Sequence, residues 1–175
     1  MIILDTVFKV FRGATLIYAA GLDPLVSKQT RAFAERDAAT LKKATLTAGI
    51  LCALPTLALC ALLLVAGDWL FALLLGKAAT VPPAAIYVLV VLLLANLAQN
   101  VASNLLLHTG FFHEMARVAT FLVAAMAVMT GVVLAAGFDI VGFIGGYAAV
   151  YVAGAALYIA YVLRGPFRIA AEGRN

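Results

Sequence analysis

Charged side chains are scarce in this sequence. Asp, Glu, Lys and Arg make up 11% of its 175 residues, against about 25% in a typical soluble domain. Hydrophobic residues make up 66%, and the mean hydropathy is +1.11. This composition excludes an ordinary soluble protein and predicts a membrane protein.

Catalytic and metal-binding motifs are also missing. The sequence has no paired carboxylates, no Ser/His/Asp set, no Gly-rich phosphate loop and no HExxH, and it lacks the D-G-x2-A-R pattern of lipid phosphotransferases. His108, His113 and Glu114 have no established ligand spacing, and we interpret them as solvated side chains of a turn. We therefore expect no enzymatic activity, no catalytic residue, no metal and no cofactor.

Cysteine is rare as well. Cys52 and Cys60 lie eight residues apart on one predicted helix. That spacing is about 12 Å along the helix axis, too far for a disulfide. We interpret both as small apolar residues that carry no information about the redox compartment.

Long apolar segments dominate what is present. Residues 44–67, 84–107, 118–138 and 140–163 are each long enough to cross a hydrocarbon core of about 30 Å. Residues 2–22 are a fifth candidate that ends at Asp23-Pro24, followed by a polar amphipathic linker helix over 23–43. An apolar hairpin, WLFALLLGK, is expected after the 44–67 span. The predicted fold is an all-α membrane protein, one domain over residues 1–175, with a bundle of about five transmembrane helices.

Proline, glycine and tyrosine positions refine this prediction. Pro82-Pro83 should begin a helix, and turns at Thr109-Gly110 and Gly137–Asp139 are short enough to make neighbouring helices antiparallel. Pro55 is either a tolerated kink or a hinge. Two further groups lie on the last span: glycines expected to let helices approach closely, and tyrosines expected either to form an interfacial belt or to stack on a sugar (Gly142, Gly145, Gly146, Gly154; Tyr147, Tyr151, Tyr158, Tyr161).

Lys and Arg are distributed unevenly among the connections. Nine of them fall in the linker, the 108–117 turn and the C-terminal tail, whereas only Lys77 falls on the opposite side. The positive-inside rule places the linker, that turn and the C-terminus in the cytoplasm, with 68–83 and Asp139 outside. The net charge of +4 is thus a topology signal, and no nucleic-acid partner is expected. The nine residues are Lys28, Arg31, Arg36, Lys42, Lys43, Arg117, Arg164, Arg168 and Arg174.

The first segment carries charge on one face. Asp5, Lys9 and Arg12 fall within about 60° of one another around a helix. If this segment spans, Met1 lies outside with no earlier helix to carry it across. Residues 1–22 are therefore either an interfacial amphipathic helix or a spanning helix of a longer protein whose preceding helix is missing. The apolar character of the rest of that face favours the second interpretation.

A polar stripe interrupts the 84–107 segment. Five side chains fall within one arc of about 140° on the helix, and an amide facing lipid costs several kcal/mol, so the stripe must face helices or water. It is either interhelical glue or the wall of a hydrophilic cavity that binds a hydroxyl-rich ligand; the number of polar groups favours the cavity. The stripe consists of Asn96, Gln99, Asn100, Ser103 and Asn104.

The order of these features resembles a known family. GLDPLVS at 21–27, the basic linker TRAFAERDAATLKK, a span with Pro55, an LLLGK turn, NLLLHTG and GFDIVGFIGGYAA follow one another as in one half of a polysaccharide flippase. The family belongs to the multidrug/oligosaccharidyl-lipid/polysaccharide exporter superfamily, which includes the O-antigen flippases. The resemblance covers nearly the whole chain and rests on topology with a few Pro, Gly and Arg positions.

The resemblance implies a fold and a function. Members have twelve or more helices in two six-helix lobes in the bacterial inner membrane, and they export lipid-linked oligosaccharides by alternating access. This chain would supply the last five helices of the C-terminal lobe, with the second lobe or a partner subunit missing. Lys9 and Arg12 would meet the lipid pyrophosphate, and the stripe from Asn96 to Asn104 would meet the sugar.

Two other functions stay open. A drug/cation antiporter of the same fold would need an acidic cavity, for which Asp5 is the only candidate. A non-transporting membrane subunit or anchor of a polysaccharide synthesis complex would have an interfacial rather than a spanning first segment.

Overall fold

The structure is a computed structural model, and it describes residues 2–75 and 81–172. Met1, Lys77 and Arg174, which entered the topology argument, lie outside the described residues. Six helices follow one another: α1 (Ile2–Ala34), α2 (Ala38–Leu75), α3 (Pro83–His108), α4 (Phe112–Ala136), α5 (Ile140–Arg164) and α6 (Pro166–Glu172). Over these ranges the chain contains no strand, as the apolar segments predicted.

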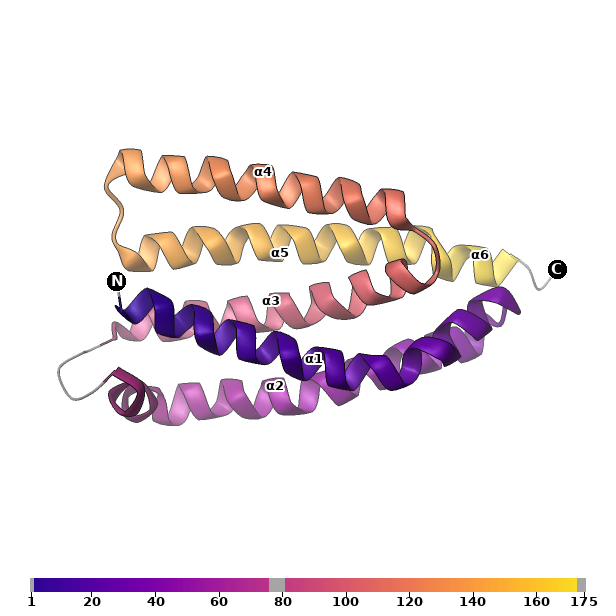
Figure 1. The fold of residues 1–175 in the computed structure, drawn as a ribbon, viewed down its shortest axis with the longest axis horizontal. Coiled ribbons are helices and arrows are strands. Elements are labelled where there is room, and N and C mark those ends of the chain that lie inside the picture. The colour runs from indigo at the N-terminus through magenta and orange to yellow at the C-terminus, as the bar shows by residue number, and fades with distance from the viewer. Residues whose placement is uncertain (1, 76–80, 173–175) are drawn as a thin grey trace.

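The long helices run up and down the bundle (Figure 1). Four stretches are long and apolar enough to cross a membrane: Ala38–Leu74, Pro83–His108, Phe112–Ala136 and Ile140–Glu172. They contain three of the four predicted segments in full and the fourth, 118–138, as far as residue 136, and they indicate an integral membrane protein. Consecutive helices from α1 to α5 are antiparallel, so α1 runs in the same direction as α3, and α6 continues in the direction of α5 (Figure 1).

The predicted linker helix over 23–43 is wrong as a separate element. Asp23-Pro24 does not end the first segment: Pro24 lies inside α1, which continues to Ala34. The buried face explains why, because Gln29 and Ala32 continue it past the proline. The chain turns only at residues 35–37, where the Asp37 carboxylate accepts hydrogen bonds from the backbone N–H groups of residues 39 and 40 at 3.1 Å and caps α2.

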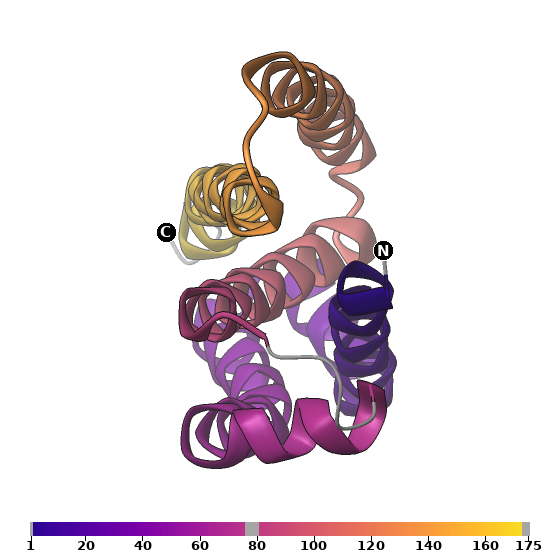
Figure 2. The same cartoon turned by 90° about the vertical axis from the view of Figure 1, so that its left-hand side faces the viewer.

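The predicted hairpin after the 44–67 span is also wrong. The backbone leaves the helical region at Ala66 (φ −131°, ψ 23°), but the chain resumes a helix that lasts to Leu75. Figure 2 shows this final part of α2 lying across the end of the bundle. Phe71 is 1% exposed within the core, so its burial holds the segment in place. The break lies eleven residues after Pro55, which is inside regular helix.

The remaining helix ends agree with the prediction. Pro83 is the first residue of α3, where its missing N–H is harmless. Gly110 and Gly137 have positive φ angles of 84° and 67° and form the two tight turns. The Asp139 carboxylate accepts a hydrogen bond from the Gly142 N–H at 2.9 Å and caps α5.

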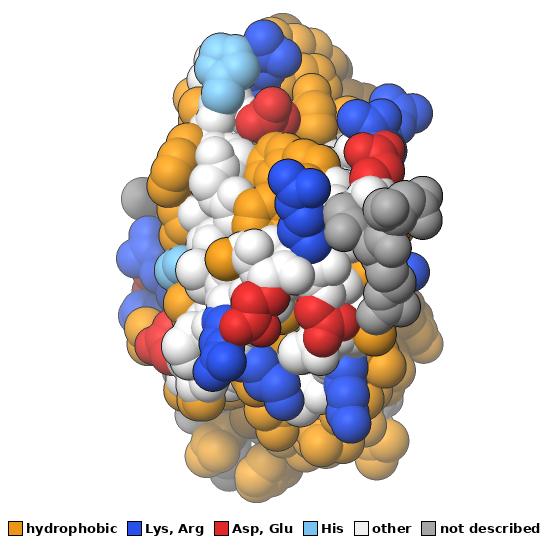
Figure 3. All heavy atoms as spheres, turned by 90° about the vertical axis from the view of Figure 1, so that its right-hand side faces the viewer, with side chains coloured by type: hydrophobic (Ala, Val, Ile, Leu, Met, Phe, Trp, Pro, Cys, Tyr) orange, Lys and Arg blue, Asp and Glu red, His pale blue; other side chains and the backbone are white. Residues whose placement is uncertain are grey.

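Charge collects at one end of the bundle. The turn between α1 and α2, the turn between α3 and α4, and α6 meet there, and Figure 3 shows Lys and Arg side chains spread over that face. At the opposite end the described chain places Asp68 and the 137–139 turn. The sequence predicted that these two groups of connections lie on opposite sides, and the fold separates them in this way.

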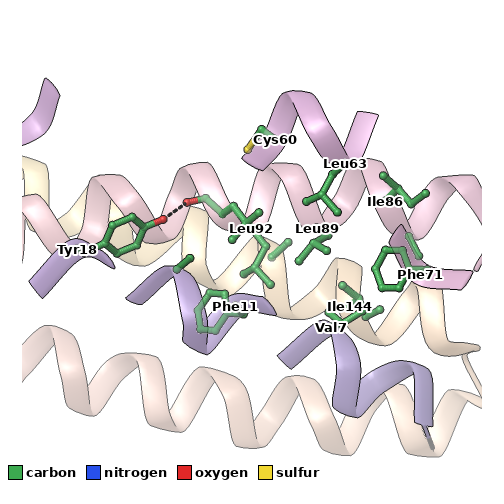
Figure 4. Packing of buried hydrophobic residues seen from close by; sticks show 14 of the residues in the cluster. Val7, Phe11, Tyr18, Cys60, Leu63, Phe71, Ile86, Leu89, Leu92 and Ile144 are labelled. Carbon is green, nitrogen blue, oxygen red and sulfur yellow. Dashed lines mark hydrogen bonds between the residues drawn. The ribbon is translucent and has the colours of Figure 1, made fainter. Parts of the chain in front are cut away.

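A hydrophobic core joins α1, α2, α3 and α5. Val7, Phe11 and Tyr18 of α1 meet Leu63 of α2, Leu89 of α3 and their neighbours (Figure 4). Cys52 and Cys60 lie in this core as free thiols, 0% and 5% exposed, so the interpretation of both as small apolar residues is confirmed.

Helix α4 is peripheral and packs mainly on α5. Its buried residues are Val118, Leu122 and Val133. A Cβ added at Gly154 would lie 2.6 Å from Leu122 Cδ2, and one at Gly146 would lie 2.8 Å from Met129 Cγ. The expected close approach is thus confirmed at these two glycines. It is not seen at Gly145, where a Cβ meets nothing within 4 Å.

Candidate functional site

The polar stripe begins with a contact between α1 and α3. Asn96 is 3% exposed, and its side-chain amide donates a hydrogen bond to Thr15 Oγ1 at 3.3 Å. The Asn100 amide donates to both the backbone oxygen and the side-chain oxygen of Asn96, each at 2.8 Å. Only the Asn96–Thr15 bond joins two helices, as interhelical glue would, whereas Asn100 bonds to Asn96 one turn earlier on the same helix.

The rest of the stripe is half-buried. The Ser103 hydroxyl donates to the Asn100 backbone oxygen at 3.3 Å. The side-chain oxygens of Gln99 and Asn104 are buried and accept no hydrogen bond from any described residue. The Gln99 oxygen lies beside α5, 3.2 Å from where a Cβ on Gly154 would stand. Each unpaired acceptor costs about 1–3 kcal/mol unless a ligand, water or partner chain donates to it.

A second polar contact lies one helical turn away and was not predicted. The Tyr18 hydroxyl donates to the Leu93 backbone oxygen at 3.3 Å and accepts a hydrogen bond from the Thr56 hydroxyl at 3.4 Å. Thr56 is 2% exposed, and its hydroxyl also lies 2.7 Å from the Cys52 backbone oxygen. The sequence signal was weak, because an isolated Tyr or Thr in an apolar helix forms no stripe.

Four aromatic rings from α1 and α5 meet beside the stripe. Tyr147 and Tyr151 are stacked with ring centroids 5.1 Å apart, and the edges of Phe8 and Phe11 pack against them in T-shaped contacts. Tyr158 is 4% exposed in the core near the basic end, so its place is inside the bundle and not in an interfacial belt. Tyr147 and Tyr151 are only partly buried.

The charged residues of α1 differ in their partners. Lys9 Nζ lies 2.6 Å from Asp5 Oδ2 in an exposed ion pair. Arg12 is exposed and has no ion pair or hydrogen bond within residues 2–75 and 81–172. It lies four residues after Phe8 and three before Thr15, so it shares a helix edge with one aromatic and one polar contact residue.

The predicted residues are thus only partly assembled. Asn96, Asn100 and Ser103 form one hydrogen-bonded group. Arg12 lies about one helical turn before Thr15, the residue to which Asn96 donates. Lys9 precedes Arg12 in α1 and is paired with Asp5. Four hollows in the described surface, of about 320–570 Å³, are lined by other residues, so the stripe lines none of those four.

Comparison with known proteins found no relative: no family model, no curated protein and no solved structure matches the chain.

Proposed function

We propose that this chain is one lobe of a membrane carrier for lipid-linked oligosaccharides that works by alternating access. The observation that carries the proposal is Arg12, an exposed guanidinium without a partner in the described chain, beside a group of amides and aromatic rings. A guanidinium binds a pyrophosphate with bidentate hydrogen bonds, and amides and tyrosines suit a sugar. The function requires no covalent chemistry.

In this proposal α1 is a fifth transmembrane helix. One face of α1 is buried in the helix bundle at residues 7, 11, 14, 18 and 22. A helix lying on the membrane surface would instead turn its apolar face toward lipid. The Asp5–Lys9 pair reduces the cost of insertion because it neutralises two of the three charges. Arg12 remains as the third charge. Because inserting an arginine into the membrane costs a free energy of about 2.5–3.5 kcal/mol, Arg12 requires a wet cavity or an anionic ligand.

The charge distribution orients the bundle. The end of the bundle that carries the excess of Lys and Arg lies in the cytoplasm, and Asp68 and Asp139 lie outside, by the positive-inside rule. The second lobe, or a partner subunit, faces the Arg12 edge of α1. Transport then follows from rocking of the two lobes around the site.

The test is a charge series at Arg12 in the cell that makes this protein. Arg12→Ala should abolish transfer of lipid-linked oligosaccharide across the membrane, and Arg12→Lys should restore only part of it because a lysine cannot bind bidentately. Lys9→Ala is the matched control with a milder effect, since Lys9 is already paired with Asp5. Membrane abundance is measured for each variant. Normal transfer by Arg12→Ala at wild-type abundance would refute the assignment.

A second candidate is a non-transporting membrane subunit of a polysaccharide synthesis complex. It is favoured by the hydrogen bond from Asn96 of α3 to Thr15 of α1, which serves helix packing without a ligand. No contact among the described residues favours a drug/cation antiporter, because Asp5, its candidate acidic residue, forms an ion pair with Lys9. The subunit predicts that Arg12→Ala leaves oligosaccharide transfer unchanged, so the same series separates the two functions.

A further inference from the structure

A hollow of about 390 Å³ opens where α2 breaks, at the end of the bundle opposite the basic face. Its wall includes Leu63–Trp69 of α2 and Pro83, Ile86 and Tyr87 at the start of α3. Gly67 brings the two helices together there, since a Cβ on it would lie 2.8 Å from Ile86 Cδ1. The volume falls in the range of about 300–1,000 Å³ of small-molecule sites.

The hollow combines three polar or aromatic side chains. Among the described residues that line it, Asp68, Trp69 and Tyr87 are those whose side chains are not aliphatic. Asp68 is exposed and forms no ion pair or hydrogen bond with any residue that the structure describes. Trp69 and Tyr87 are 62% and 63% exposed, so two large accessible aromatic side chains line the hollow together with this carboxylate.

This combination recognises cations of one chemical kind. A carboxylate attracts any cation, but aromatic side chains favour an organic ammonium group, whose positively polarised C–H and N–H groups contact the ring quadrupoles. The backbone leaves the helical region at Ala66, and because such a break interrupts the hydrogen bonds of the adjacent turn, we expect backbone carbonyls there to accept from a ligand. An N–H of a primary ammonium can donate to such a carbonyl.

We propose that Asp68, Trp69 and Tyr87 form a binding site for an organic ammonium group at the outer end of the bundle. The carboxylate supplies the charge, the rings supply the cation–π contacts, and the helix break supplies hydrogen-bond acceptors. Trp and Tyr are enriched at the level of lipid headgroups, so a membrane aminolipid and a free amine both have access to the site. The site is independent of Arg12, which lies on another helix, and its failure would leave the transport proposal untouched.

Trp69 is the only tryptophan in the chain, so its fluorescence reports this hollow directly. The full chain in a maltoside detergent, which has no ammonium group, is titrated with ethanolamine and with choline, and with KCl at equal ionic strength. The site predicts a saturable change in Trp69 emission with the two amines and none with KCl. Asp68→Asn should weaken the apparent affinity about fivefold, and Tyr87→Leu should weaken it as well.

Asp139→Asn is the matched control, because Asp139 is an acidic residue at the same end but caps α5, a role that Asn also fills. An equal response to KCl, an Asp68→Asn variant that responds like the wild type, or an Asp139→Asn variant weakened as much as Asp68→Asn would overturn the proposal.

Bilayers identify the source of the ammonium group. Phosphatidylglycerol bilayers are compared with and without phosphatidylethanolamine. A change in Trp69 emission that requires phosphatidylethanolamine and that Asp68→Asn weakens assigns the site to the lipid headgroup. A response to free ethanolamine alone assigns it to a soluble amine, and a response to neither probe overturns the site.

Discussion

Small residues decide how closely α1 approaches α2. A Cβ added at Gly21 would lie 2.8 Å from Cys52 Sγ, and Cys52 is 0% exposed. Cys52 also donates a weak hydrogen bond to the Tyr18 backbone oxygen at 3.7 Å. The pair therefore sets the distance between the two helices at the point where Tyr18 and Thr56 form their hydrogen bond.

Gly21→Ala should destabilise the protein, because the new methyl overlaps the thiol of a residue that has no room to move. We expect a loss of about 1–3 kcal/mol, measured by thermal unfolding in detergent. Gly13→Ala is the control on the same helix, since a Cβ there meets nothing within 4 Å and the gain in helix propensity is the same.

Removal of the thiol should rescue the variant. In Gly21→Ala/Cys52→Ala the two small side chains fit together, and stability should return toward that of Cys52→Ala alone. A Gly21→Ala protein as stable as Gly13→Ala would contradict the packing at this position.

At the scale of elements, α4 is the helix with least support. In its apolar 18-residue stretch, 11% of the residues are buried, against 39% in the corresponding stretch of α3. Its contact with α5 depends on Gly146 and Gly154, which receive Met129 and Leu122. An outer helix held mainly by one neighbour is the element expected to separate first.

Gly154→Leu should loosen α4, since its side chain must occupy the place of Leu122. Hydrogen exchange of the α4 amides should accelerate while exchange in α1 and α2 stays as in the wild type. Gly145→Leu is the control on the same helix, because it adds the same side chain into open space. Equal exchange in the two variants would show that Gly154 does not hold α4.

The elements also show what the sequence could predict. Apolar length gave four of the helices, and Gly110, Gly137 and Asp139 marked their ends, because each of these signals is local. Pro24 was read as a stop, but continued burial at Gln29 and Ala32 outweighs one lost hydrogen bond. The sequence also did not predict the helix after Ala66. That helix is held by the burial of Phe71 in the core, and the residues that cover Phe71 are distant in the sequence.

The candidate site divides in the same way. The periodicity of Asn96, Asn100 and Ser103 predicted one polar face, and the hydrogen bonds among them follow from that spacing. Their partner Thr15 could not be predicted, since it lies 81 residues away from Asn96 along the chain. The same holds for the packing of Phe8 on Tyr147.

At the scale of the whole molecule, the proposed carrier lobe requires α1 to cross the membrane. With 33 residues α1 is about 50 Å long, enough to cross a hydrocarbon core of about 30 Å and extend beyond it. Its first part, residues 2–22, carries three charged side chains and lies beside α2 and α3, whereas its C-terminal turns lie at the basic end (Figure 1). The five-helix lobe and the position of Arg12 both depend on this crossing.

Labelling of single cysteines at the two ends of α1 tests this most directly. In a chain with Cys52→Ala and Cys60→Ala, a membrane-impermeant maleimide is applied to intact cells that carry either Asp5→Cys or Ser27→Cys, both at exposed positions. Spanning in the proposed orientation predicts that Asp5→Cys is labelled from outside and that Ser27→Cys is labelled only after the membrane is opened. Labelling of both positions from the same side would show that α1 does not cross the membrane.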